Sequence, residues 1–114
     1  MAVPVVALVG TFLLAVLFYS VTAHIAARYV LGDVPIVRAF AVGLVPAAIA
    51  FALQAYGPLV VILVSASADF FAIRGIYRLQ LRTAGLVTLV HYTVSVIAGI
   101  TILNVVRLLS TAPV

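Results

Sequence analysis

The chain has 114 residues, of which 68% are hydrophobic and 7% are charged, with a formal net charge of +4. This composition excludes a soluble globular domain, because ordinary domains are about 45–50% apolar and about 25% charged. Cysteine is absent, which excludes disulfides and thiolate metal sites. The few arginines form no solvated basic face, so we expect no nucleic-acid partner. The bilayer is the expected solvent.

Three stretches contain no Asp, Glu, Lys or Arg, and each is longer than the roughly 20 residues that cross a bilayer. They cover residues 1–27, 39–68 and 83–106. The middle stretch is interrupted by Tyr56-Gly57-Pro58, a turn signal whose proline cannot continue a preceding helix. The predicted transmembrane helices cover about residues 4–31, 34–55, 58–78 and 82–109. The sequence therefore predicts an all-α polytopic membrane protein, a single transmembrane domain folded as a compact bundle of four helices.

The ends of the first two predicted helices carry turn residues. Gly32 suits the C-cap of the first helix, Asp33 suits the N-cap of the second, and Pro35 suits its first turn. No basic residue precedes the first apolar run, and the run is too long for a secretory signal, so we expect it to remain as a membrane anchor.

The six arginines are divided unevenly between the two sides of the predicted bundle. Five of them flank the first and third turns, whereas Arg107 lies near the opposite side. Because cytoplasmic loops accumulate arginine, the termini are predicted to lie outside and the loops near residues 32 and 80 in the cytoplasm of a multi-pass cell-membrane protein. The five residues are expected to determine topology or to contact lipid head groups, including anionic ones. They are Arg28, Arg38, Arg74, Arg78 and Arg82. The last three would share one basic face if the third helix continued past the interface.

Asp69 is the one acidic residue without an interfacial position. It follows Pro58 by 11 residues, which places it near the bilayer midplane, where a carboxylate needs a partner or a cavity. If the third turn is centred near Gln80, His91 lies at the same depth, and His24 lies slightly nearer the cytoplasm. We therefore predict an intramembrane polar cluster of Asp69, His91 and His24.

Two interpretations of this cluster remain open. In the simpler one, Asp69 and His91 form a hydrogen bond that fastens two helices together. In the other, Asp69 carries a proton or ion and His91 or His24 relays it. A metal site is not expected, because the three side chains lie on separate helices without motif spacing.

Small residues recur at helical spacing on two of the predicted helices. They permit close helix approach in lipid and are the expected packing positions. These are Ala39, Gly43 and Ala47 on the second helix, and Ser95 and Gly99, which follow His91, on the fourth.

The chain contains no phosphate-binding glycine loop, no Gly-x-Ser-x-Gly motif and no paired carboxylates for acid–base work. We therefore expect neither an enzyme nor a cofactor.

Two segments carry a resemblance to known proteins. Residues Phe18–Phe40 (FYSVTAHIAARYVLGDVPIVRAF) and Leu89–Val114 (LVHYTVSVIAGITILNVVRLLSTAPV) are similar to a group of short, uncharacterised haloarchaeal four-helix membrane proteins. The resemblance implies a membrane location and no activity. The small multidrug resistance transporters and the fluoride channels are similar in length, but the essential glutamate of the former and the asparagine-rich motifs of the latter are missing.

Two functions are compatible with these features. The first is a structural or accessory subunit that packs against lipid, against other copies or within a larger membrane complex. The alternative is a homo-oligomeric, proton-coupled transporter or channel for a small solute or ion, organised around Asp69.

Overall fold

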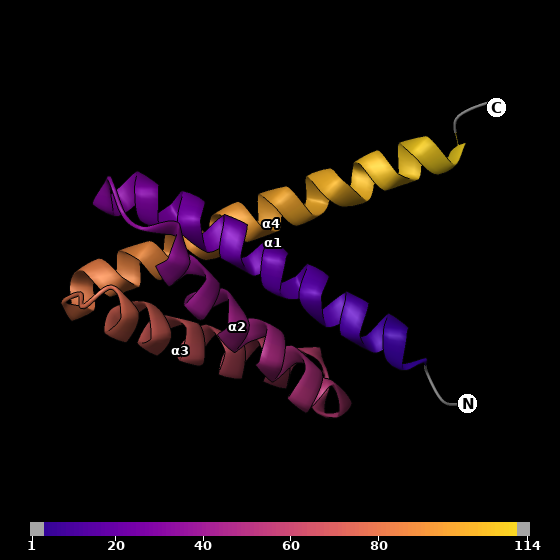
Figure 1. Ribbon diagram of the computed structural model, residues 1–114, viewed down its shortest axis with the longest axis horizontal. Helices are drawn as coiled ribbons and strands as arrows, with labels where there is room; N and C mark the ends of the chain where they lie inside the picture. The colour runs from indigo at the N-terminus through magenta and orange to yellow at the C-terminus, as the bar shows by residue number, and fades with distance from the viewer. Residues whose placement is uncertain (1–3, 112–114) are drawn as a thin grey trace.

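The computed structural model describes residues 4–111, which form four long helices (Figure 1). The helices are α1 (Val5–Leu31), α2 (Ile36–Leu53), α3 (Pro58–Ile76) and α4 (Leu81–Thr111), and a short 3₁₀ helix, η1 (Gln54–Tyr56), follows α2. Each end lies within two residues of the expected one. Residues 4–111 contain no strand.

All four helices are long and apolar enough to cross a membrane. Most of their apolar side chains point outward: in α1 and α4 only 11% of the most apolar window is buried inside the protein. Leu14 and Leu89, for example, are 68% and 65% exposed. Hydrocarbon is the solvent that such a surface requires, which confirms the prediction of an all-α, polytopic membrane bundle.

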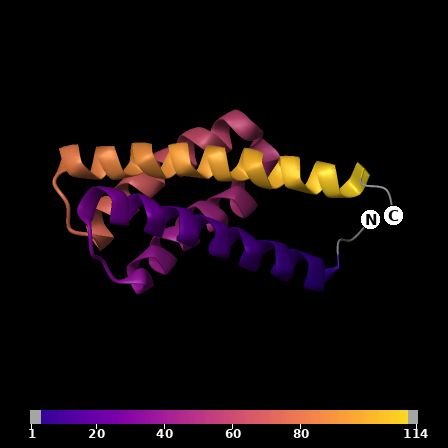
Figure 2. The same cartoon turned by 90° about the horizontal axis from the view of Figure 1, so that it is seen from above.

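The helices contact one another in the order of a closed ring, with α1 against α2, α2 against α3, α3 against α4 and α4 against α1. The helices α1 and α4 cross each other (Figure 1), and they diverge toward the start of α1 and the end of α4 (Figure 2). The first turn of α1 and the last turn of α4 therefore lie at the same end of the molecule, as an even number of membrane crossings requires.

The core between α1 and α2 is built from small residues. Ala23, Ala26 and Ala27 of α1 are buried together with Ala39 and Ala47 of α2. At Gly43 the two backbones approach so closely that an added Cβ would overlap the hydroxyl and the backbone of Ser20. The α1–α2 contact thus depends on a residue without a side chain, as expected for helices that associate in lipid.

The α1–α2 turn differs from the expectation at two residues, Asp33 and Pro35. Gly32 ends α1 with φ 86°, and its N–H donates to the carbonyl of Arg28, which confirms the predicted C-cap. Asp33 is not the N-cap of α2, and Pro35 does not lie in its first turn, since Pro35 is the residue before the helix and no side chain caps it. The Asp33 carboxylate lies instead 3.9 Å from the Arg28 guanidinium, and both side chains are exposed.

The α3–α4 turn separates the arginines that precede and follow it. Helix α3 ends at Ile76, and Arg78 has a left-handed backbone with φ 55°. The N–H of Leu79 donates to the carbonyl of Arg74 at 2.9 Å, which closes the helix end. Because the chain turns at Arg78, the expected continuous basic face of Arg74, Arg78 and Arg82 is not formed.

Candidate functional site

The buried polar residues of α3 and α4 meet at Asp69 and His91. The Nδ1 atom of His91 lies 2.6 Å from the Oδ2 atom of Asp69, and the two side chains are 3% and 0% exposed. The α3–α4 hairpin places the two residues at one depth, because each is 11 residues from Gln80. The structure therefore brings together two of the three residues of the predicted cluster.

The third partner in the structure is Thr22 of α1, which the sequence analysis did not single out. Its Oγ1 atom lies 3.0 Å from the Nε2 atom of His91. The same depth count would have found it, since Thr22 precedes Asp33 by 11 residues. Threonine is common in apolar helices, so its residue type gave no signal, and only the packing of α4 against α1 selects it. We call Asp69, His91 and Thr22 the polar triad.

His24 lies outside the polar triad. It is half-buried, and no hydrogen bond joins it to Asp69 or His91 among the described residues. Two residues along an α-helix correspond to a rotation of about 200°, so His24 points away from the direction in which Thr22 points. The prediction of a cluster that includes His24 is therefore wrong in that member.

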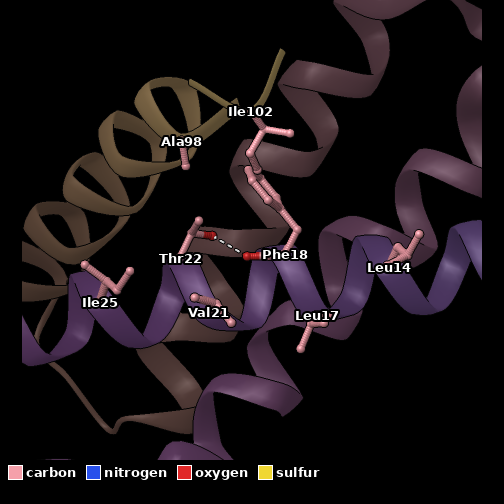
Figure 3. Close-up of a pocket in the computed structure, with 8 residues that line it drawn as sticks. All are labelled: Leu14, Leu17, Phe18, Val21, Thr22, Ile25, Ala98 and Ile102. Carbon is pink, nitrogen blue, oxygen red and sulfur yellow. Dashed lines mark hydrogen bonds between the residues drawn. The ribbon is translucent and has the colours of Figure 1, made fainter. Parts of the chain in front are cut away.

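The geometry of the polar triad is compatible with the following arrangement of its protons. The Thr22 hydroxyl donates to the carbonyl of Phe18 at 3.0 Å, with the carbonyl of Tyr19 at 3.1 Å (Figure 3). The Nε2–H of His91 then donates to Thr22 Oγ1, and one further proton is shared between His91 Nδ1 and Asp69 Oδ2. The triad is neutral overall in this arrangement. An unpaired charge would cost several kcal/mol at such a site.

Some buried polar side-chain atoms of the bundle have no partner within residues 4–111. The second carboxylate oxygen of Asp69, Oδ1, is buried without a hydrogen bond, as are the hydroxyls of Ser20 and Ser95 and the Nδ1 atom of His24. Ser65, one turn before Asp69 on α3, is also buried. Polar atoms at membrane depth are costly when unpaired, so these positions are the least satisfied part of the bundle.

The order of the polar triad is that of an acyl-transfer triad, with a hydroxyl, an imidazole and a carboxylate in sequence. Two features oppose that chemistry. The Thr22 side chain is bonded to the backbone of its own helix, and the residue is 2% exposed. It also lies in the interior of α1, where backbone N–H groups are used by the helix and are not free to stabilise an oxyanion.

Thr22 nevertheless contributes to the wall of a cavity between α1 and α4 that has a volume of about 470 Å³ (Figure 3). The rest of this wall is apolar and includes Phe18 and Val21 of α1 and Ala98 and Ile102 of α4. Within residues 4–111, no three His, Cys, Asp or Glu side chains converge in a way that could hold a metal ion.

The predicted packing positions divide into two groups. Ala39, Gly43 and Ala47 are all buried. Ser95 is half-buried, and a Cβ added to Gly99 would meet no atom within 4 Å, so no close helix approach depends on this glycine. The five predicted head-group arginines are exposed, and they lie at or beside the two turns at one end of the bundle. They are Arg28, Arg38, Arg74, Arg78 and Arg82.

These features define a small multi-pass membrane protein whose helices meet at a buried Asp–His–Thr hydrogen-bond chain. The chain belongs to DUF7473, a family of unknown function, whose model matches residues 2–113. No curated protein and no solved structure is detectably similar to it. The family description names no activity, so no functional residue is transferred to this chain.

Proposed function

We propose that this protein is a structural or accessory subunit of the cell membrane, and that the polar triad fastens its helices together. The observation that supports this function is the closed hydrogen bonding of His91. Both of its ring nitrogens are engaged within the protein, on Asp69 at 2.6 Å and on Thr22 at 3.0 Å. A histidine that relays protons needs a ring nitrogen that can exchange its proton with water or with another titratable group. A histidine that only links helices needs a hydrogen-bond partner in the protein for each ring nitrogen.

The position of the triad suits a fastening role. It links α4 to α3 on one side and to α1 on the other, near the middle of the predicted membrane span. A hydrogen bond between transmembrane helices contributes about 0.6 kcal/mol on average and up to about 2 kcal/mol. Two such bonds stabilise a bundle whose other contacts are mainly van der Waals contacts between small residues.

The free end of α4 supplies a surface for the accessory role. Every residue from Leu103 to Thr111 is exposed, and the segment extends beyond the part of α4 that packs on the bundle (Figure 1). It includes Leu103, Val106 and Leu109 as exposed apolar side chains. Lipid, another copy or a larger complex would cover this segment in the membrane.

Substitution of Asp69 separates fastening from transport. Asp69→Asn presents an amide N–H that donates to the Nδ1 atom of a neutral His91 but cannot carry a proton, whereas Asp69→Leu removes the hydrogen-bond partner. We expect Asp69→Asn to assemble as the wild type does, and Asp69→Leu to lose about 1–3 kcal/mol because His91 is left unpaired. Thermal unfolding in detergent and size-exclusion chromatography measure both effects, with Ser67→Ala, an exposed position on the same helix, as the control.

Proton-coupled transport is the second candidate, and one observation favours it. The buried Asp69 Oδ1 atom has a free acceptor position, and the unpaired hydroxyls of Ser20 and Ser95 are the kind of polar atoms that border a proton pathway. A proton-flux assay in proteoliposomes decides between the candidates. Flux in the wild type that is lost in Asp69→Asn would overturn the accessory role. No flux in the wild type, or equal flux in both proteins, would contradict transport.

A further inference from the structure

The seam between α1 and α4 carries a groove on its outer face. It consists of two hollows that share Ile25: the one of about 470 Å³ that Thr22 borders, and a second of about 360 Å³. The second hollow is lined mainly by Tyr29 of α1 and by Leu89, Val90, Thr93 and Val94 of α4. We call the two hollows together the α1–α4 groove.

The α1–α4 groove has the length and polarity of a lipid chain site. On α1 it extends from Leu14 to Tyr29, which at 1.5 Å per residue is about 22 Å. One leaflet of the hydrocarbon core is about 15 Å thick, so the groove accommodates a chain that starts at one interface and reaches past the midplane. Its walls are almost entirely apolar, and Leu14, Val21 and Ile25 are 68%, 45% and 49% exposed.

Each of the two helices carries an arginine toward the turn end of the molecule, although neither arginine lines the two hollows. On α1, Arg28 continues the stripe formed by Leu14, Val21 and Ile25, at spacings of 7, 11 and 14 residues from Leu14. On α4, Arg82 precedes Leu86, Leu89 and Thr93 at spacings of 4, 7 and 11 residues, which is again one helix face. The start of α4 and the end of α1 lie at one end of the molecule (Figure 2).

These two arginines are available to an anion. The Arg28 side chain is 60% exposed, and its contact with the Asp33 carboxylate is 3.9 Å long, with Asp33 itself 99% exposed. Arg82 is also exposed. Asp33 is the one acidic residue at this end of residues 4–111, against five arginines, so the net charge at this end is positive. Guanidinium groups bind phosphate oxygens in a bidentate manner, which makes a phosphate the matching head group.

A second copy of the chain fits the α1–α4 groove less well than a lipid does. In a two-fold dimer through this groove, each chain would present the same surface to the other. The arginines of both copies would then meet at one membrane level, where like charges repel. Close helix approach would also need small residues, whereas Leu, Val and Ile line most of the groove.

We propose that the α1–α4 groove binds one anionic phospholipid of the bilayer, with a hydrocarbon chain along Ile25 and the phosphate on Arg28 and Arg82. This site does not depend on whether the protein is an accessory subunit or a transporter. Of the polar triad only Thr22 borders the groove, and Asp69 and His91 take no part in lipid binding.

Native mass spectrometry of the detergent-solubilised protein tests the proposal. We expect phosphatidylglycerol to be retained as one molecule per chain, and phosphatidylcholine to be retained about tenfold less. Inorganic phosphate in excess should not displace the bound lipid, because it lacks a chain. Equal retention of the two lipids would overturn the proposal, as would displacement by inorganic phosphate.

Variants assign the lipid to the groove. Arg28→Gln with Arg82→Gln should weaken phosphatidylglycerol binding about tenfold, and Ala98→Phe should block the chain; Arg107→Gln, at the far end of α4, is the matched control. Leu89→Ser, which removes an exposed part of the wall, serves if Ala98→Phe does not fold, as judged by circular dichroism. Wild-type lipid retention in the folded groove variants would contradict the proposal. A chain dimer that Ala98→Phe abolishes, in place of a lipid adduct, would assign the groove to a second copy.

Discussion

Tyr77 shows how a single buried hydroxyl affects this protein. It follows α3 immediately, is 5% exposed, and its hydroxyl has no partner within the chain. Burial raises the pKa of its phenol above the usual 10, and the nearby Arg38 partly offsets this by lowering the pKa. The folded protein therefore holds the Tyr77 proton more tightly than the unfolded chain does.

Tyr77→Phe is expected to stabilise the protein by about 1 kcal/mol, because it removes a buried donor that makes no hydrogen bond. The raised pKa adds a pH dependence. Stability contributed by the neutral phenol is complete below pH ~10 and is lost as the pH rises through the folded-state pKa. Thermal unfolding at pH 8 and pH 11 measures both effects. Tyr56→Phe, at an exposed position, is the control, and an equal alkaline loss in Tyr77→Phe and the wild type would contradict this explanation.

The polar triad was partly predictable from residue type and depth. Asp69 and His91 are rare residues in apolar helices, and counting from the turn at Gln80 places them together. Thr22 was not predicted, because threonine is ordinary in such helices, and His24 was wrongly included. The difference between these two residues is one of helix rotation, which is set by the packing of α4 on α1 and not by depth.

At the scale of the elements, α1 and α2 are held together by the close approach of Ser20 and Gly43. A Cβ at Gly43 would lie 2.7 Å from the backbone nitrogen of Ser20, which no change of side-chain rotamer can relieve. Gly43 was predicted as a packing position, but only the structure identifies Ser20 as the residue opposite it.

Gly43→Ala should therefore separate α1 from α2 and lower the free energy of unfolding by about 1–3 kcal/mol, the usual cost of overpacking. Gly99→Ala is the matched control, since a Cβ there meets no atom within 4 Å and the substitution adds helix propensity. Chemical denaturation in mixed micelles compares the two. A Gly43→Ala protein as stable as Gly99→Ala would show that this contact is not tight.

At the scale of the whole molecule, the distribution of arginine predicts the orientation in the membrane. Five of the six arginines lie at or beside the two turns at one end, and this asymmetry predicts that these turns are cytoplasmic. The four helices agree with a multi-pass protein in which the start of α1 and the end of α4 share a side.

Single cysteines measure this orientation directly, because the natural chain has none. Thr111→Cys should react with a membrane-impermeant maleimide in intact cells, whereas Asp33→Cys should react only after permeabilisation. Both positions are exposed, so accessibility depends on the side of the membrane and not on burial. The reverse pattern would invert the predicted topology, and labelling of both positions in intact cells would indicate mixed insertion.

The sequence by itself determined the number of helices, their limits to within two residues and the membrane location. These properties depend on composition and on local signals such as Gly57-Pro58, which act along the chain. Helix rotation and pairing were decided only by the tertiary structure. Rotation brings Thr22 to His91 and turns His24 aside, and pairing puts Gly43 against Ser20 and opens the α1–α4 groove. Lipid chains are as apolar as the side chains of these helices, so burying one helix face or another changes the solvation free energy little. The hydrophobic pattern therefore does not identify the face that points inward, and packing between the helices decides it.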